Sequence, residues 1–232
     1  MVRRTDSVIW FGFTYCISET SVDSQVITSV NNLFSMSDRK LYTTADYVPW
    51  ETAMTLIRQL YEDGDYRMSL LVGCGCFFGL RISDLRCLTW NQVLGSDEFT
   101  IWEQKTGKRR VIRVNAGFRE HIRRCHDAMK VRDDSQPCFL NRYGSLLSLQ
   151  MINRLLKDLK RKYRLKVANF STHSLRKTWA RAVYENENAQ GRGELALLKL
   201  SELMNHSDPA ITRRYIGLRQ QELKEVYDTL KF

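Results

Sequence analysis

The chain has 232 residues, of which 43% are hydrophobic and 27% are charged, enough for one large domain or for a domain with an appendage. Its formal net charge of +10 favours a polyanionic partner, either nucleic acid or an anionic membrane surface. The apolar run over residues 69–80 is too short to span a bilayer, so no membrane span is predicted. The six cysteines form no CxxC pair, and most lie in apolar or helical contexts. We therefore predict reduced, buried thiols and a cytoplasmic protein.

Regular helical periodicity begins near residue 44. Residues 1–43 show no long amphipathic pattern and are expected to form a short, loosely ordered N-terminal segment. A first helix is predicted from Pro49, which suits a first helical turn, to the break at residues 63–64. A second helix over residues 66–78 is apolar nearly all round and should be buried.

A charged residue, Arg81, stands where the second helix gives way to a third. A cation beside such an apolar helix requires a partner or a function. The simplest explanation is an ion pair with Asp84, three residues further on. A functional role is the alternative.

Short β-type runs follow, and they flank the sequence Lys105-Thr106-Gly107-Lys108. This pattern predicts a β-hairpin with those residues at its tip, although a solvated turn would look the same. A helix over residues 116–130 carries His121 and His126, whose spacing does not match a metal site. We interpret both histidines as surface residues. A brief strand is predicted over residues 138–140.

The helix predicted over residues 149–166 ends in a basic run. The run holds six cations, at positions 157, 160, 161, 162, 164 and 166, against one acid at position 158. Most such runs are solvated faces. The net charge of the chain and the interleaved Tyr163 favour contact with a phosphate backbone.

The C-terminal stretch over residues 171–217 holds two of the four histidines. On a helix, His173 and Arg176 are three residues apart and share a face. Residues 205–209 read as the end of one helix and the start of another, because Pro209 suits a first turn. The new helix carries Tyr215. A last amphipathic helix, over residues 218–230, could pack on its own chain or on a neighbouring subunit.

Several of these segments together resemble the tyrosine recombinase (phage integrase) family. The matching motifs are GLRISDL followed by LTW, then KTG, HSLRKT and LMNHSDPAITRRY. The resemblance runs from about residue 44 to the C-terminus, and six motif positions occur in family order. The site residues that it implies are Arg81, Lys105, His173, Arg176, His206 and Tyr215. We expect folding to gather these six side chains around a gap of the size of a phosphate.

The chemistry of these residue types suits phosphoryl transfer. Two guanidinium groups can hold the non-bridging oxygens of a phosphodiester, and His206 can donate another hydrogen bond. Tyr215 would be the nucleophile, with His173 accepting its proton. Lys105 resembles the general acid of the family, which returns a proton to the leaving 5′-oxygen. Asp84 would orient these groups.

The resemblance also predicts the fold, the activity and the partners. It implies a mainly α-helical catalytic domain with a small antiparallel β-sheet (α+β), the fold of DNA breaking–rejoining enzymes, over residues 44–232. It implies site-specific DNA recombination or integration through a 3′-phosphotyrosine bond, with no metal, ATP or other cofactor. The expected partners are double-stranded DNA and further copies of the chain, forming a tetramer through the last helix. We expect a cytoplasmic enzyme associated with the nucleoid, which integrates a mobile element.

Complete members of the family carry a sizeable helical core-binding domain before the catalytic one, where this sequence has roughly forty residues. A shortened enzyme, a gene fragment and a relict all fit, and each predicts weaker, strongly salt-dependent DNA binding. Three other functions remain open. They are a type IB topoisomerase-like relaxation of supercoils, a DNA-binding module without catalysis, and a metal-dependent transposase, for which no acidic triad stands out.

Overall fold

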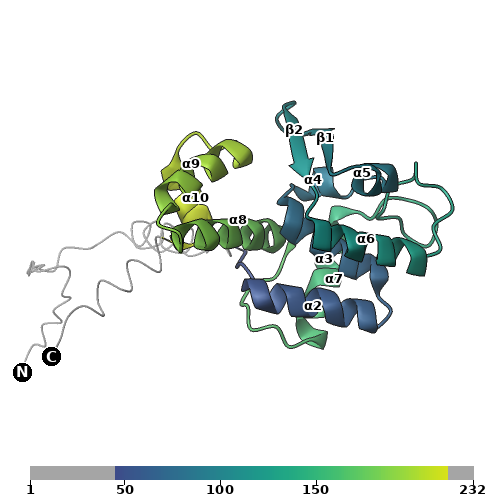
Figure 1. Cartoon of the computed structure of the whole chain (residues 1–232). Helices are drawn as coiled ribbons and strands as arrows, with labels where there is room; N and C mark the ends of the chain where they lie inside the picture. Colours follow the sequence, from purple (N-terminus) through teal and green to yellow (C-terminus); the bar gives the residue numbers. More distant parts are fainter. Residues whose placement is uncertain (1–44, 219–232) are drawn as a thin grey trace, which may run out of the picture. The chain divides into compact units, whose positions relative to one another are not determined.

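In the part of the chain that the structure describes, the fold is mainly helical with one small antiparallel sheet, as predicted (Figure 1). It is described from a computed structural model for residues 45–218. The elements are α2 (Trp50–Glu62), α3 (Tyr66–Phe78), α4 (Ile82–Leu85), α5 (Trp90–Gly95), β1 (Glu98–Trp102), β2 (Arg109–Arg113), α6 (Ala116–Ala128), α7 (Leu149–Lys162), α8 (Thr172–Asn188), α9 (Gly193–Met204) and α10 (Pro209–Tyr215). The predicted N-terminal segment over residues 1–43 lies outside the described residues, as does the predicted last helix beyond residue 218. Within the described part, no helix is both long and apolar enough to cross a bilayer.

Local sequence signals set the ends of α2 and α3, which confirms both predicted helices. The chain leaves α2 through Gly64, whose φ of +78° is readily adopted only by glycine. Asp65 then caps α3, because its side chain accepts a hydrogen bond from the Met68 amide. The helix ends at Gly79 in the left-handed conformation. A β-carbon at Gly79 would lie only 2.1 Å from the Trp179 ring, so this position also needs a bare backbone.

The β-hairpin forms as predicted, with strands β1 and β2 paired antiparallel from Glu98 opposite Arg113 to Trp102 opposite Arg109. Alternate residues of each strand are buried, as the two-residue period of a strand requires. The hairpin projects beside α4 and α5, with the tip residues 104–108 at its far end (Figure 1).

Four predicted elements differ from the structure. Helix α6 ends at Ala128 rather than at residue 130. Helix α7 ends at Lys162 rather than at residue 166. The predicted strand over residues 138–140 does not form, and of its residues only Leu140 makes an isolated β-bridge, with Leu146. The third predicted helix is a short turn, α4, and Leu88 is buried beyond its end.

The interpretation of His121 and His126 as surface residues is wrong. His121 lies against the Tyr61 ring and within 3.0 Å of the Ser69 hydroxyl, on the face of α6 that packs on α3. The His126 side chain is only 20% exposed and lies 2.7 Å from an Asp134 carboxylate oxygen. Both rings therefore help to fix α6 to its neighbours.

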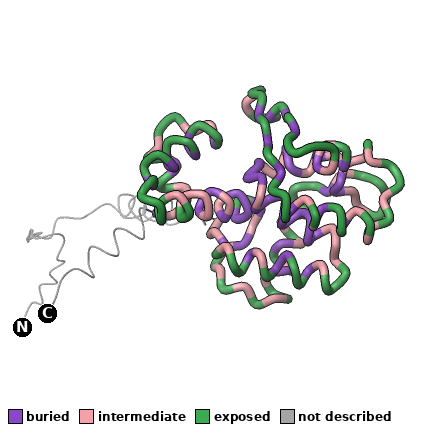
Figure 2. Tube along the Cα trace, in the orientation of Figure 1, coloured by how far each residue is buried: buried purple, intermediate pink, exposed green. Residues whose placement is uncertain are grey.

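Helix α8 connects two hydrophobic cores (Figure 2). Its first half contributes Leu175 to the main core, which is built chiefly around α2, α3, α6 and α7. Its second half contributes Ala180 to a smaller core with α9 and α10. The residues of this smaller core are Ala180, Leu197, Leu200, Met204, Ile216 and Leu218. Since α8 belongs to both cores, polar groups from either one can meet along it.

The basic run at the end of α7 is partly engaged within the chain. Lys162 and Tyr163 both bond to the Asp63 carboxylate, and Lys160 donates to the Ala168 carbonyl. Arg161 pairs with Asp158. Lys157 is exposed on the same helix. Contact between this run and a phosphate backbone stays a prediction.

Candidate active site

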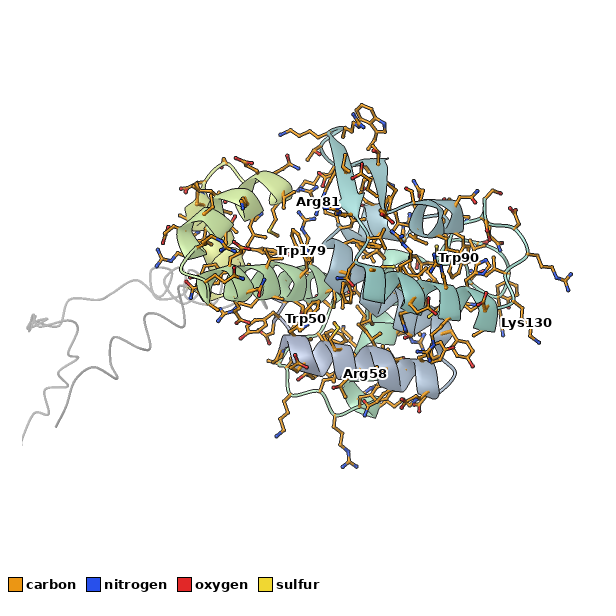
Figure 3. The ribbon with its side chains drawn as sticks, in the orientation of Figure 1. Trp50, Arg58, Arg81, Trp90, Lys130 and Trp179 are labelled. Atoms are coloured by element: carbon orange, nitrogen blue, oxygen red, sulfur yellow. The ribbon has the colours of Figure 1, made fainter. Side chains whose placement is uncertain are left out.

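Arg81 lies between the β1–β2 hairpin and α9, above α8 (Figure 3). One terminal nitrogen donates to the Glu103 carboxylate at 2.7 Å, and the other donates to the Met204 carbonyl at 3.2 Å. The predicted partner Asp84 is not used. Arg81 precedes α4 in an extended conformation, with φ −66° and ψ 147°, so the rule that residues three apart on a helix meet does not apply.

Arg176 reaches the same carbonyl from α8. Its side chain is buried, and its terminal nitrogens donate to the Gly79 carbonyl at 2.6 Å and to the Met204 carbonyl at 3.4 Å. Met204 is the last residue of α9, where backbone carbonyls lack helical partners and the helix dipole is negative. The end of α9 thus brings Arg81 and Arg176 together.

Arg176 lies near two other positive charges, those of Arg81 and Arg110. Burial, together with the positive charges of Arg110 and Arg81, lowers the pKa of Arg176 to about 10. The cluster is therefore electrostatically unfavourable in itself, and an additional anion placed among these cations would be stabilised.

His206 is held by a chain of hydroxyl groups. Ser201 donates to the Leu197 carbonyl at 2.8 Å, so it must accept its second bond, also 2.8 Å, from Thr212. The only hydroxyl proton of Thr212 is then used, and Thr212 accepts from Nδ1–H of His206 at 2.8 Å. This assignment leaves Nε2 of His206 available to another group.

Burial and the charges of Arg176 and Arg81 lower the pKa of His206 below its ordinary value of 6.5. The ring is therefore neutral at pH 7 when no other anion is present. A phosphate placed between the two arginines would oppose this shift and favour a proton on Nε2.

Tyr215 ends α10 beside the His206 ring, with the two ring centroids 5.6 Å apart. The Lys177 ammonium lies 5.1 Å from the centre of the tyrosine ring. The phenol oxygen is buried and makes no hydrogen bond to any residue within 45–218. Burial raises the pKa of Tyr215, while the charges of Arg176 and Arg81 lower it. The phenol thus lies within the electrostatic influence of both arginines without a hydrogen bond to either.

His173 and Lys105 complete the predicted set at its more exposed side. His173 lies in the first turn of α8, and Lys105 is at the hairpin tip. Burial lowers the pKa of His173, and the charges of Arg176, Lys177 and Lys105 add to the effect. His173 is therefore neutral at pH 7 and can accept a proton. Arg81, Arg176, His206 and Tyr215 thus lie together, whereas His173 and Lys105 are linked to them here only through these charge interactions, and their place in the site stays a prediction.

Several polar residues of the cluster were missed in the sequence. They are Glu103, Arg110, Asn205 and Thr212. The alternation of the strands could have identified two of them, Glu103 and Arg110. The alternation that buries Phe99 and Ile101 also turns Glu103 inward, and the one that buries Ile112 turns Arg110 inward.

Asp84 contacts the hairpin. Its carboxylate accepts from the Gln104 backbone amide at 2.9 Å, next to Lys105, and the side chain is buried. Within residues 45–218 no group of three His, Cys, Asp or Glu side chains is arranged to hold a metal ion. The assembled groups are instead suited to binding an anion, accepting a proton and donating one.

Comparison with known proteins identifies relatives of this sequence. Residues 51–222 match the phage integrase family. The probable integrase/recombinase YoeC of Bacillus subtilis (strain 168) is 28% identical over 172 residues, which cover 74% of this chain and 88% of that protein. The tyrosine recombinase XerC of Caldanaerobacter subterraneus is 26% identical over 188 residues, covering 77% of this chain and 49% of that protein. The chain thus spans about half the length of this XerC.

Solved structures share the fold. XerA recombinase matches with a TM-score of 0.62 and 20% identity, over 82% of this chain and 66% of that one. The Tn1549 transposon integrase in complex with transposon right end DNA matches with a TM-score of 0.60 and 14% identity, over 81% and 67%. A lambda integrase dimer bound to a core site gives 0.56 and 14%, over 78% and 50%.

Proposed function

The chain belongs to the phage integrase family, and we propose that it is a site-specific DNA recombinase that cleaves and rejoins strands through a 3′-phosphotyrosine intermediate. The observation that carries this proposal is the convergence of Arg81 and Arg176 on the Met204 carbonyl, close to the Tyr215 phenol, which has no hydrogen-bond partner among the described residues. Two guanidinium groups can offset the charge that otherwise repels a nucleophile from a phosphodiester.

In the proposed reaction, the Tyr215 oxygen attacks phosphorus and its proton passes to neutral His173. The bond between phosphorus and the 5′-oxygen breaks, and that oxygen takes a proton from the Lys105 ammonium. His206 carries a second proton once the phosphate is bound and donates from Nε2 to a non-bridging oxygen. One phosphodiester replaces another, so the cut keeps its bond energy and ATP is not needed. A 5′-hydroxyl from another strand reverses the step.

The substrate is double-stranded DNA, consistent with the net charge of +10. Recombination exchanges strands between two sites, for which we propose a tetramer held together through the C-terminal residues. We further propose integration of a mobile element and a location in the cytoplasm with the nucleoid.

The same chemistry could instead relax supercoils, as a type IB topoisomerase does, or the chain could bind DNA without cutting it. The convergence of both arginines near the Tyr215 phenol supports cleavage over binding alone. Relaxation by a monomer without strand exchange would identify the topoisomerase-like activity.

A nicked suicide substrate tests the proposal, because the short fragment released by cleavage diffuses away and traps the covalent complex. The wild-type chain should give a protein–DNA band that survives denaturation, and Tyr215→Phe should give none. Tyr143→Phe is a matched control, since this tyrosine is 75% exposed, and it should react like the wild type. A band that persists in Tyr215→Phe would contradict the proposal.

A further inference from the structure

Glu103 is a buried carboxylate at the base of an otherwise exposed hairpin tip. Its side chain is 1% exposed, whereas the next residues, Gln104 and Lys105, are exposed. Burying a carboxylate is costly unless its oxygens are paired. Its partners therefore indicate what this residue does.

Four donors converge on this carboxylate, two from its own hairpin and two from distant parts of the chain. One oxygen accepts from Arg81 at 2.7 Å, from Asn205 at 2.8 Å and from Thr106 at 2.8 Å. The other oxygen lies 3.5 Å from Arg110. Arg81 precedes α4 and Asn205 follows α9, so Glu103 joins the hairpin both to the start of α4 and to the end of α9.

The backbone of Glu103 also closes the hairpin turn. Its amide donates to the Lys108 carbonyl at 2.9 Å, and its carbonyl accepts from the Gly107 amide at 2.8 Å. Lys105 lies inside this closed turn. A side chain that holds residue 103 against Arg81 therefore limits where the Lys105 ammonium can go.

Glu103 is ionised at neutral pH. Burial alone would raise its pKa, but hydrogen bonds from Thr106 and Arg81 and the charges of Arg81 and Arg110 lower it below the ordinary value of 4.5. Its negative charge offsets part of the arginine cluster.

We propose that Glu103 is a positioning residue that fastens the Lys105 hairpin to Arg81 and Asn205, and so presents the Lys105 ammonium to the leaving 5′-oxygen. This inference rests on the proposed function, in which Lys105 is the general acid. Glu103 itself touches neither the phosphate nor the leaving group in this account.

Replacing the leaving 5′-oxygen by sulfur distinguishes the positioning of Lys105 from a role in the arginine clamp. A thiol has a pKa of about 8.5, far below that of an alcohol, so a thiolate leaves without a proton donor. A defect that acts through Lys105 should therefore vanish on 5′-sulfur DNA, whereas a defect in the arginine clamp should remain.

The variant Glu103→Gln has the same size and keeps one acceptor oxygen. Single-turnover cleavage of 5′-oxygen DNA should fall about 10- to 100-fold, as expected for a misplaced catalytic group, and recover to within about threefold on 5′-sulfur DNA. Lys105→Ala should show the same recovery, and Arg81→Ala should not. Glu98→Gln, at the exposed first position of β1, should match the wild type on both substrates.

Two results would overturn the proposal. One is an equal loss on both substrates, which would assign Glu103 to the arginine clamp. The other is no loss on 5′-oxygen DNA.

Backbone amide exchange gives a readout that does not depend on cleavage. Without DNA, the amides of residues 104–108 should exchange faster in Glu103→Gln than in the wild type or in Glu98→Gln. Equal rates would mean that Glu103 does not hold the hairpin. If the wild type forms no covalent complex on either substrate, the proposed function fails, and the exchange rates alone then decide whether Glu103 positions the hairpin.

Discussion

The hydroxyl of Thr212 is the link on which the orientation of His206 depends. Thr212→Val removes this hydroxyl and keeps the shape of the side chain. Two hydrogen bonds of 2.8 Å are lost, and Nδ1–H of His206 is left without a partner. Ser201 keeps its bond to the Leu197 carbonyl.

The magnitude follows from these contacts. Two hydrogen bonds at about 0.5–1.5 kcal/mol each give a loss of about 1–3 kcal/mol in the free energy of unfolding. For a domain of this size, a loss near the middle of that range lowers the Tm by about 4–8 °C. Since the His206 ring can then turn, single-turnover cleavage should fall by about tenfold or more.

The matched control is Thr212→Ser, which keeps the hydroxyl and loses a methyl group at a fully buried position. It should lose about 1 kcal/mol of stability and retain cleavage. Thermal unfolding and a suicide-substrate time course measure both quantities. A free energy of unfolding of Thr212→Val within about 0.5 kcal/mol of the wild-type value, the usual range for an inconsequential substitution, would show that these hydrogen bonds do not stabilise the fold. Equal cleavage rates in the two variants would show that the Thr212 hydroxyl does not orient His206.

Three further predictions concern pH, packing and salt. Burial lowers the pKa of His121 below 6.5, so the unfolded chain binds more protons than the folded one as the pH falls. Urea titrations should therefore show the free energy of unfolding decreasing from about pH 7 to about pH 5, and decreasing less in His121→Gln. The same pH dependence in the variant and the wild type would argue against this. Gly75→Ala places a β-carbon 2.7 Å from Leu175 and should cost about 1–3 kcal/mol in thermal unfolding. Gly95→Ala, with nothing within 4 Å, should cost none, and equal costs would contradict the packing argument. If Lys157 contacts a phosphate, Lys157→Ala should reduce the slope of log affinity against log salt by about 0.9, and an unchanged slope means no contact.

Local signals were sufficient to predict the helices that frame the site. The break at Gly64 and the turn at Gly79 place the ends of α2 and α3 from sequence alone, because each marks a conformation that few residues adopt. Pro209 likewise marks the start of α10. These signals do not depend on distant parts of the chain.

Partners across the fold were not predictable in the same way. Arg81 pairs with Glu103, 22 residues away, and shares the Met204 carbonyl, 123 residues away, with Arg176. Only the packing of the hairpin and of α9 against α8 brings these groups together. Sequence proximity favoured Asp84, which instead holds the hairpin through the Gln104 amide.

For the inward-facing residues of the hairpin, the sequence predicts burial but not the partners. The alternation that defines the strands, continued by one step, turns Glu103 and Arg110 toward the core. What each charge meets there depends on the tertiary structure. His121 is similar, since its spacing from buried Phe118 and Cys125 puts it on the inner side of α6, although a histidine on an amphipathic helix is easily read as exposed.

In the proposed reaction Tyr215 becomes covalently attached to DNA, and peptide mapping of the trapped complex identifies the attached residue. Trypsin should release residues 215–219, YIGLR, which contain one of the ten tyrosines of the chain. We expect a nucleotide joined through its 3′-phosphate to this peptide, and a free 5′-hydroxyl on the other side of the cut. Attachment to any other residue, or through a 5′-phosphate, would contradict the proposed reaction.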